Sequence, residues 1–175
     1  MGLLRLFDAW REWRLPRGHR RRIRAARRVL TRIHSWDAAR IFGYLRKVDP
    51  LMFEELILES FSRSGFRVRR NRRYSGDGGI DGQVRLNGAW APVQCKRYSA
   101  HINPAHVADF TAVLRRCRAP AGLFVHTGRT GPASREGAAR AGVTIISGRR
   151  LIALLQARDP DESARQLLRS SDWGS

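Results

Sequence analysis

Hydrophobic positions follow two different periods along the chain, and the periods predict where helices and strands lie. Apolar residues recur at helical spacing in 3–13 and 53–61, whereas 66–70, 84–86 and 89–98 alternate as strands do. The later pattern predicts a helix over 104–117, a strand over 122–127, a helix over 132–140, a strand over 143–146 and a helix over 149–157. With 175 residues, the chain is long enough for one such domain.

The clearest helix signal begins at Asp49. Asp49 is a good N-cap and Pro50 suits the first helical position, while Gly65 ends the pattern after Ser64. On a helical wheel one side is apolar and predicts the face toward the core, formed by Phe53, Leu56, Ile57, Leu58 and Phe61.

One acid of this helix falls on the apolar side. Glu54 lies between Phe61 and Leu58 on the wheel, whereas Glu55 and Glu59 are expected outside that face. A carboxylate directed at the core costs free energy unless it is paired or binds a metal. Glu54 is therefore the acid that needs an explanation.

A β-hairpin is predicted around Asn87 and Gly88, which favour a two-residue type I′ turn. Paired residue numbers then sum to 175, which places Asp81 opposite Gln94. Because side chains alternate, Asp81, Gln94 and Lys96 are expected on one polar face. The opposite face is expected to be core, formed by Val84, Leu86, Val93 and Cys95.

The charge balance is unusual. Against 15 acidic residues stand 34 basic ones, which gives a net charge of +19. Only Lys47 and Lys96 are lysines, so the other 32 basic residues are arginines. A charge this high predicts a polyanionic partner, with nucleic acid as the first candidate.

Residues 1–35 hold eleven of the arginines against Asp8 and Glu12, and they predict two basic helices. Three interpretations stay open: an arm that grips nucleic acid phosphates, helices whose apolar side docks on the core, and contact with a membrane surface. No apolar stretch approaches the ~18 residues of a membrane span. The two cysteines, Cys95 and Cys117, are expected to be buried thiols in a reducing, cytoplasmic setting.

The residues of the hairpin and of the helix at 50–64 suit metal-assisted hydrolysis of a phosphodiester. Asp81 and Glu54 would supply hard oxygen ligands to Mg²⁺, which activates water and neutralises charge on phosphate. Lys96, a compact ammonium in an arginine-rich chain, would orient the water and stabilise the transition state. Gln94 would hold water or a ligand through its amide.

The same residues resemble the catalytic domain of Mrr-type restriction endonucleases in the PD-(D/E)xK superfamily. The resemblance covers roughly 48–157 and is carried by Phe53-Glu54, Gly65-Phe66, Gly76-Asp77-Gly78-Gly79-Ile80-Asp81, Val93-Gln94-Cys95-Lys96-Arg97, Phe124 to Gly128, Ala138 to Gly142 and Ile145-Ile146-Ser147-Gly148.

The resemblance implies an α/β fold with a restriction-endonuclease-like core, in which a mixed central β-sheet is flanked by α-helices. It places Glu54, Asp81, Gln94 and Lys96 on active-site positions and adds the backbone carbonyl of Cys95 as a metal ligand, with Mn²⁺ as a substitute for Mg²⁺. The nuclease domain would span 48–157, after a basic helical extension over 1–47 and before a C-terminal helix or tail over 158–175. No winged-helix DNA reader is found in the sequence.

The predicted function is a metal-dependent DNA endonuclease of restriction type that acts on double-stranded DNA, with a homodimer expected because two strands are cut. Two alternatives stay open: a non-cleaving DNA-binding module with the nuclease fold, and a nuclease specific for junctions or flaps. The arginines expected at phosphates are Arg20, Arg21, Arg22, Arg69, Arg70, Arg72, Arg73, Arg97 and Arg129.

If these arginines neutralise phosphates, DNA affinity should fall steeply with salt. Each phosphate contact contributes a slope of about −0.9 to log K against log salt concentration. Fluorescence anisotropy of a labelled duplex between low and moderate salt measures this slope. An affinity that barely changes over that range would exclude phosphate gripping as the main source of binding.

Overall fold

The structure is a computed structural model, and it describes residues 15–71 and 79–157. Three predictions fall wholly or partly outside these residues: the helix near the N-terminus, the first three residues (76–78) of the glycine-rich turn at 76–82, and the helix or tail over 158–175.

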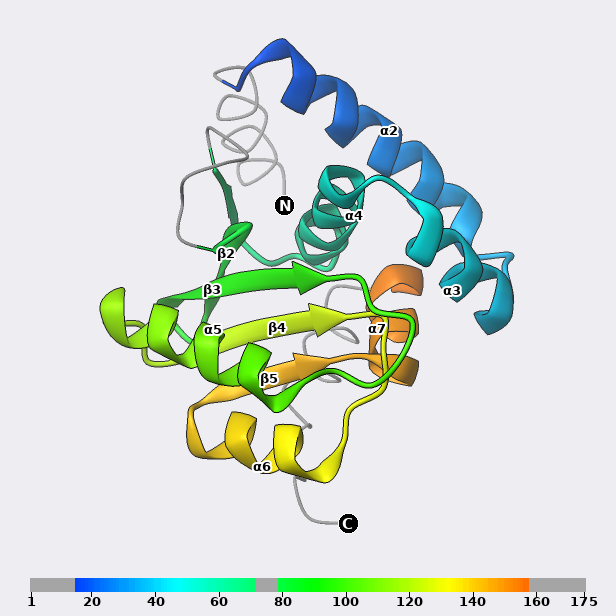
Figure 1. Cartoon of the computed structure of the whole chain (residues 1–175). Coiled ribbons are helices and arrows are strands. Elements are labelled where there is room, and N and C mark those ends of the chain that lie inside the picture. Colours follow the sequence, from blue (N-terminus) through cyan, green and yellow to red (C-terminus); the bar gives the residue numbers. More distant parts are fainter. Residues whose placement is uncertain (1–14, 72–78, 158–175) are drawn as a thin grey trace.

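One five-stranded sheet forms the centre of the fold, with the strands in sequence order (Figure 1). The first three strands are antiparallel and the last three are parallel, so the expected mixed sheet is confirmed. The strands are β1 (Val68–Arg70), β2 (Gly82–Leu86), β3 (Ala89–Lys96), β4 (Gly122–His126) and β5 (Val143–Ile146).

Helices cover both faces of this sheet and create two apolar clusters. The larger cluster joins one sheet face to α2 (Arg17–Ile33), α3 (Ala38–Lys47), α4 (Pro50–Arg63) and α7 (Gly148–Gln156). The smaller one joins the other face to α5 (Pro104–Arg116) and α6 (Pro132–Arg140), which lie side by side in Figure 1. In the described part of the chain, no helix has the length and apolar character needed to cross a membrane.

Local sequence signals are confirmed where they specify caps and turns. The Asp49 side chain accepts a hydrogen bond from the Met52 backbone N–H at 3.2 Å, and Gly65 has a φ of 86° after the end of α4. Asn87 and Gly88 have φ values of 46° and 84°, as a type I′ turn requires.

One face of the hairpin is core as expected, and on the opposite face Arg85 and Lys96 are exposed, whereas Gln94 is only 8 % exposed. One other expectation is wrong. Cys117 was expected to be buried like Cys95, but it follows the end of α5 and is exposed. The helix α3 had no counterpart in the prediction.

The helix α2 docks on the core, which confirms the docking interpretation for its part of the N-terminal region. Its apolar side packs against α4 and α7, and the core continues across residue 47 without a break. The buried residues of α2 are His19, Ile23, Ala26, Leu30 and Ile33.

Glu55 and Glu59 of α4 are buried at 1 % and 3 % exposure, so their predicted position outside the core is wrong. The reason is α2, which covers that side of α4. Arg70 compensates both carboxylates, with Nε 2.9 Å from Glu55 and Nη2 2.7 Å from Glu59. From α2, Arg27 Nε lies 2.8 Å from Glu59, and His19 Nδ1 lies 3.6 Å from Glu55. We call these five residues the ion-pair network.

Replacement of Arg70 by alanine should lower the free energy of unfolding by about 3–5 kcal/mol, because two buried carboxylates lose their shared partner. Arg140→Ala is the matched control, because its ion pair with Glu136 at 3.7 Å is 75 % and 67 % exposed, and loss of such a pair should change stability by less than about 1 kcal/mol. Urea denaturation measures both values. Equal small losses would show that the network contributes no more than a surface pair.

Candidate active site

Three predicted site residues come from three elements that meet at one end of the hairpin. Glu54 lies in α4, Asp81 directly precedes β2, and Lys96 is the last residue of β3. A β-carbon at Gly82 would lie 2.8 Å from the Leu58 side chain of α4, so glycine permits this close approach of strand and helix.

The backbone at Asp81 departs from the predicted pairing. The hairpin register is confirmed within β2, where Gly82 pairs with Val93. The Asp81 N–H, however, also bonds to the Val93 carbonyl at 2.9 Å, so two residues of one strand meet one residue of the other, as in a β-bulge. The predicted Asp81–Gln94 pair is therefore wrong, and the bulge redirects the Asp81 side chain.

The Asp81 carboxylate is held by the neighbouring strand. Its Oδ2 accepts a hydrogen bond from the Cys95 backbone N–H at 2.6 Å. Because the N–H and C=O of one strand residue point to the same side, the Cys95 carbonyl is directed to this side as well.

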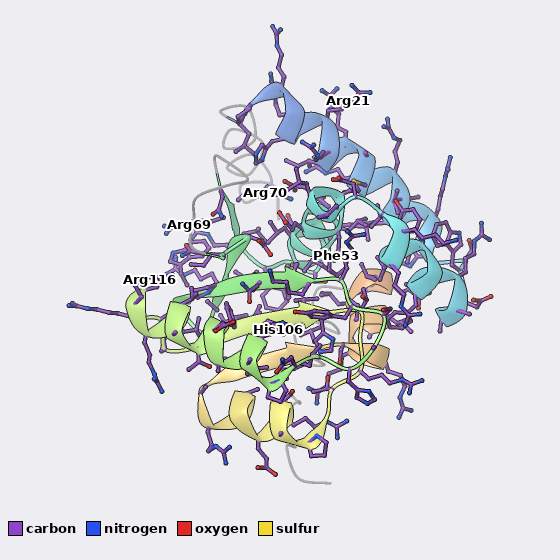
Figure 2. The ribbon with its side chains drawn as sticks, in the orientation of Figure 1. Arg21, Phe53, Arg69, Arg70, His106 and Arg116 are labelled. Carbon is purple, nitrogen blue, oxygen red and sulfur yellow. The ribbon has the colours of Figure 1, made fainter. Side chains whose placement is uncertain are left out.

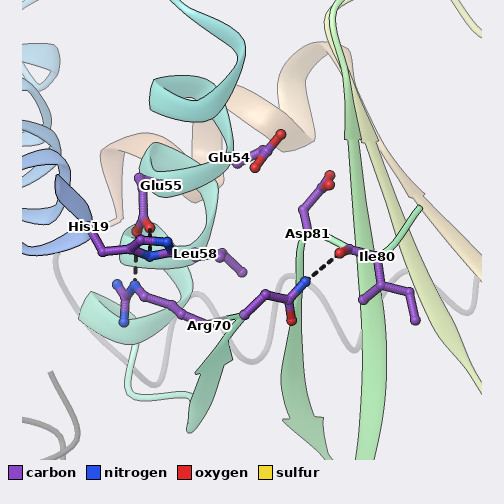
Figure 3. A pocket seen from close by; sticks show the side chains of 8 residues that line it. His19, Glu54, Glu55, Leu58, Arg70, Ile80 and Asp81 are labelled. Carbon is purple, nitrogen blue, oxygen red and sulfur yellow. Dashed lines mark hydrogen bonds and ion pairs between the residues drawn. The ribbon is translucent and has the colours of Figure 1, made fainter. Parts of the chain in front are cut away.

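Glu54 and Asp81 face the same space between α4 and β2 (Figure 3). Burial raises the pKa of Glu54 to about 8, and repulsion by Asp81 adds to this shift. Burial also raises the pKa of Asp81 to about 6, against the opposing effects of the Cys95 hydrogen bond and the Lys96 charge. The Lys96 charge favours the ionised form of both carboxyl groups.

Gln94 fixes the turn that leads to Asp81. Its side-chain Nε2 donates to the Gly79 carbonyl at 2.7 Å. Gly79 has a φ of 89°, and a β-carbon there would come within 2.9 Å of Nε2, so this contact requires glycine. The structure therefore places the Gln94 side chain against the backbone that leads to Asp81. We call the carboxyl groups of Glu54 and Asp81 the carboxylate pair.

A small open pocket connects the carboxylate pair with the ion-pair network (Figure 3). The sequence interpretation missed the network side of this pocket. The signals available in the sequence were Glu55 and Glu59, which lie one turn apart in α4, and His19 on the apolar side of α2. The pocket is lined by His19, Glu54, Glu55, Leu58, Arg70, Asn71, Ile80 and Asp81.

The carboxyl groups of Glu54 and Asp81 have the chemistry of a divalent-cation site. The described residues contain no group of three or more His, Cys, Asp or Glu side chains arranged to hold a metal ion. Glu54 and Asp81 nevertheless offer hard oxygen atoms, and burial, the main cause of their raised pKa values, makes it costly for both to be ionised without a further cation. This donor set fits Mg²⁺, which protein sites often bind through one or two carboxylates.

The predicted phosphate-binding arginines are dispersed over the fold. Arg20, Arg21 and Arg22 belong to α2, and Arg21 projects from its outer side in Figure 2. The guanidinium of Arg69 lies 4.0 Å from the centre of the Trp90 ring. Arg129 is exposed in the loop after β4. Arg72 and Arg73 lie outside the described residues.

Two other arginines have structural partners instead. The Arg70 side chain is 8 % exposed and belongs to the ion-pair network. Arg97 donates to the backbone carbonyls of Arg46 and Val48 at 3.1 and 2.5 Å, which ties the end of β3 to the end of α3. Their guanidinium groups are thus engaged within the protein, and we leave both out of the proposed DNA contacts.

Comparison with known proteins identifies the family. A model of the Mrr catalytic domain, described as a restriction endonuclease, matches residues 45–155. The chain belongs to this restriction endonuclease family, and the resemblance inferred from the sequence motifs is confirmed. No curated protein matches the chain.

A solved structure of the MspJI restriction endonuclease in complex with a 27-mer oligonucleotide is similar to the chain at 25 % identity and a TM-score of 0.44. The match covers 83 % of this chain and 36 % of that one. The chain thus spans about a third of the length of that protein.

The raised pKa of Glu54 predicts a pH-dependent stability in the metal-free protein. Between its ordinary value of 4.5 and about 8, the folded state holds a proton that the unfolded state releases, so stability falls as pH rises. In chelator, Glu54→Gln should therefore gain stability relative to wild type from about pH 4.5 upward and level off above about pH 8.

Urea denaturation at pH 5, 6.5 and 8.5 measures this difference. Glu136→Gln is the control, because its side chain is 67 % exposed and its difference from wild type should stay constant. A constant difference for Glu54→Gln as well would contradict the burial of Glu54 beside Asp81.

Proposed function

We propose that the chain is a Mg²⁺-dependent endonuclease that hydrolyses phosphodiester bonds of double-stranded DNA, of the restriction type. The observation that carries the proposal is the pair of carboxyl groups of Glu54 and Asp81, which face one space and share the influence of Lys96. Family membership over residues 45–155 supports the same reaction class.

Glu54 and Asp81 are the proposed metal ligands, and the Cys95 carbonyl is the third. When bound, the divalent ion lowers the pKa of water and neutralises charge that develops on the phosphate. The Cys95 N–H bond keeps Asp81 oriented for this role. Mn²⁺ is a proposed substitute for Mg²⁺.

Lys96 and Gln94 have different proposed roles. The Lys96 ammonium is exposed at the end of β3, where it orients the attacking water and stabilises negative charge in the transition state. Gln94 acts through Gly79, because its bond to that carbonyl fixes the turn before Asp81. Of these two residues, only Lys96 is expected to contact the reacting groups.

Several further predictions stay predictions. Arg20, Arg21, Arg22, Arg69 and Arg129 are the proposed phosphate contacts among the described residues, supported by a net charge of +19. A homodimer is proposed because a double-strand break needs two cuts, and a cytoplasmic location is proposed for an enzyme that meets DNA in the cell.

Plasmid cleavage tests the proposal with full-length protein, unmethylated and methylated substrate, and Mg²⁺ or chelator. Wild type should cut only with the metal ion. Asp81→Asn should lower the cleavage rate by at least about a thousandfold, as loss of one group from an interdependent site does. Asp109→Asn removes one exposed carboxylate from α5 and should cleave like wild type.

Other outcomes would point to the alternatives. Tight DNA binding without cleavage of any plasmid in Mg²⁺ or Mn²⁺ would overturn the enzyme proposal in favour of a non-cleaving DNA-binding module. Cleavage confined to branched substrates in a panel of duplexes, junctions and flaps would replace the restriction type by a structure-specific nuclease.

A further inference from the structure

The ion-pair network is joined to the helix that carries Glu54. Glu55 directly follows Glu54 on α4 and is 1 % exposed. Its Oε2 lies 2.9 Å from Arg70 Nε, and the Arg70 side chain is 8 % exposed. A buried ion pair of this length fixes the helix relative to β1, because each charge is costly without the other.

The same network is joined to the segment that carries Asp81. Arg70 ends β1 and is followed by Asn71, whose side-chain amide donates to the Ile80 carbonyl at 2.5 Å. Ile80 directly precedes Asp81. The ion pair between Arg70 and Glu55 therefore links the two segments that hold the candidate metal ligands.

The helix α2 completes the network. Glu59 bridges Arg70 at 2.7 Å and Arg27 at 2.8 Å, so its charge is shared between β1 and α2. In the network, the two carboxylates of Glu55 and Glu59 thus face the two guanidinium groups of Arg70 and Arg27. Burial and the neighbouring arginines lower the pKa of His19. Without Arg27, two buried carboxylates would depend on Arg70 alone among the arginines of the network.

We infer that α2, which precedes the family-matched residues 45–155, belongs to the catalytic unit, and that Arg27 is a positioning residue acting through Glu59, Arg70 and Glu55 on the placement of Glu54 relative to Asp81. The inference rests on the proposed function, because it concerns the same carboxylate pair. It assigns to α2 a role beyond that of a basic DNA-binding arm.

The neighbouring residue provides a matched control. Arg28 is exposed on the same helix and carries the same charge, and it forms none of the ion pairs of the network. If α2 only gripped DNA, loss of either arginine would weaken DNA binding similarly and leave the turnover of bound DNA unchanged. If Arg27 positions the site, only its loss changes turnover.

The test compares full-length Arg27→Ala and Arg28→Ala proteins. Plasmid cleavage gives kcat and KM, and calorimetric titration gives the affinity for Mn²⁺ without DNA. We expect Arg27→Ala to lower kcat by about 10–100-fold and to weaken Mn²⁺ binding, as changes behind metal ligands do. We expect similar KM values for the two variants and a wild-type kcat for Arg28→Ala.

A charge-preserving variant and a second charge-removing pair keep the test decisive. Arg27→Lys should recover most of the lost kcat and Mn²⁺ affinity, because it restores a positive charge beside Glu59. If Arg27→Ala fails to fold, the pair Arg27→Gln and Arg28→Gln replaces the alanine pair. In that pair, a lower kcat for Arg27→Gln than for Arg28→Gln supports the inference, and equal values overturn it.

The outcomes separate the two proposals. Wild-type cleavage with equal kcat and equal Mn²⁺ affinity in folded Arg27→Ala and Arg28→Ala would overturn the positioning role and leave the nuclease intact. A wild-type protein that neither cuts DNA nor binds Mn²⁺ would overturn the proposed function, and the inference with it.

Discussion

The fold depends on one electrostatic constraint, which is that two adjacent turns of α4 bury a carboxylate each. Glu55 and Glu59 could not remain ionised there without partners, because an unpaired buried charge costs several kcal/mol. Arg70 contacts both, and Arg27 contacts the second. The positions of α2 and β1 on α4 therefore follow from charge compensation as well as from the apolar core that surrounds it.

Two neighbouring acids of α4, Glu54 and Glu55, have opposite electrostatic surroundings, and this contrast defines the candidate site. Glu55 meets a guanidinium at 2.9 Å, whereas the pKa of Glu54, one residue earlier, is raised by burial and by the Asp81 carboxyl group and lowered only by the Lys96 charge. The first arrangement neutralises charge within the protein. The second leaves charge to be neutralised from outside, which is the property expected of a site that recruits a cation before it acts on an anion.

Local sequence signals predicted most of the fold, and distant packing accounts for what they missed. Asp49, Gly65 and the Asn87–Gly88 turn act on their own neighbourhood, so α4 and the hairpin were predicted closely. Glu54, Asp81 and Lys96 meet at one end of that hairpin, and their roles stay predictions. The burial of Glu55 depends on α2, more than twenty residues away, and the bulge at Asp81 depends on one backbone bond. Neither the burial of Glu55 nor the bulge at Asp81 produces a periodic pattern in the sequence.

The ion pairs that connect α2 to β1 also limit how early these two elements can dock during synthesis of the chain. Arg27 and Arg70 are 43 residues apart, and at about 5–20 residues per second the ribosome needs roughly 2–9 s to add them. Until residues 50–63 have been added, the apolar side of α2 has no α4 to cover it, and until residue 70 has been added the network lacks Arg70. The helix α2 is thus made before its partners, so the described segment from α2 to β1 reaches its final arrangement only after β1 has been added.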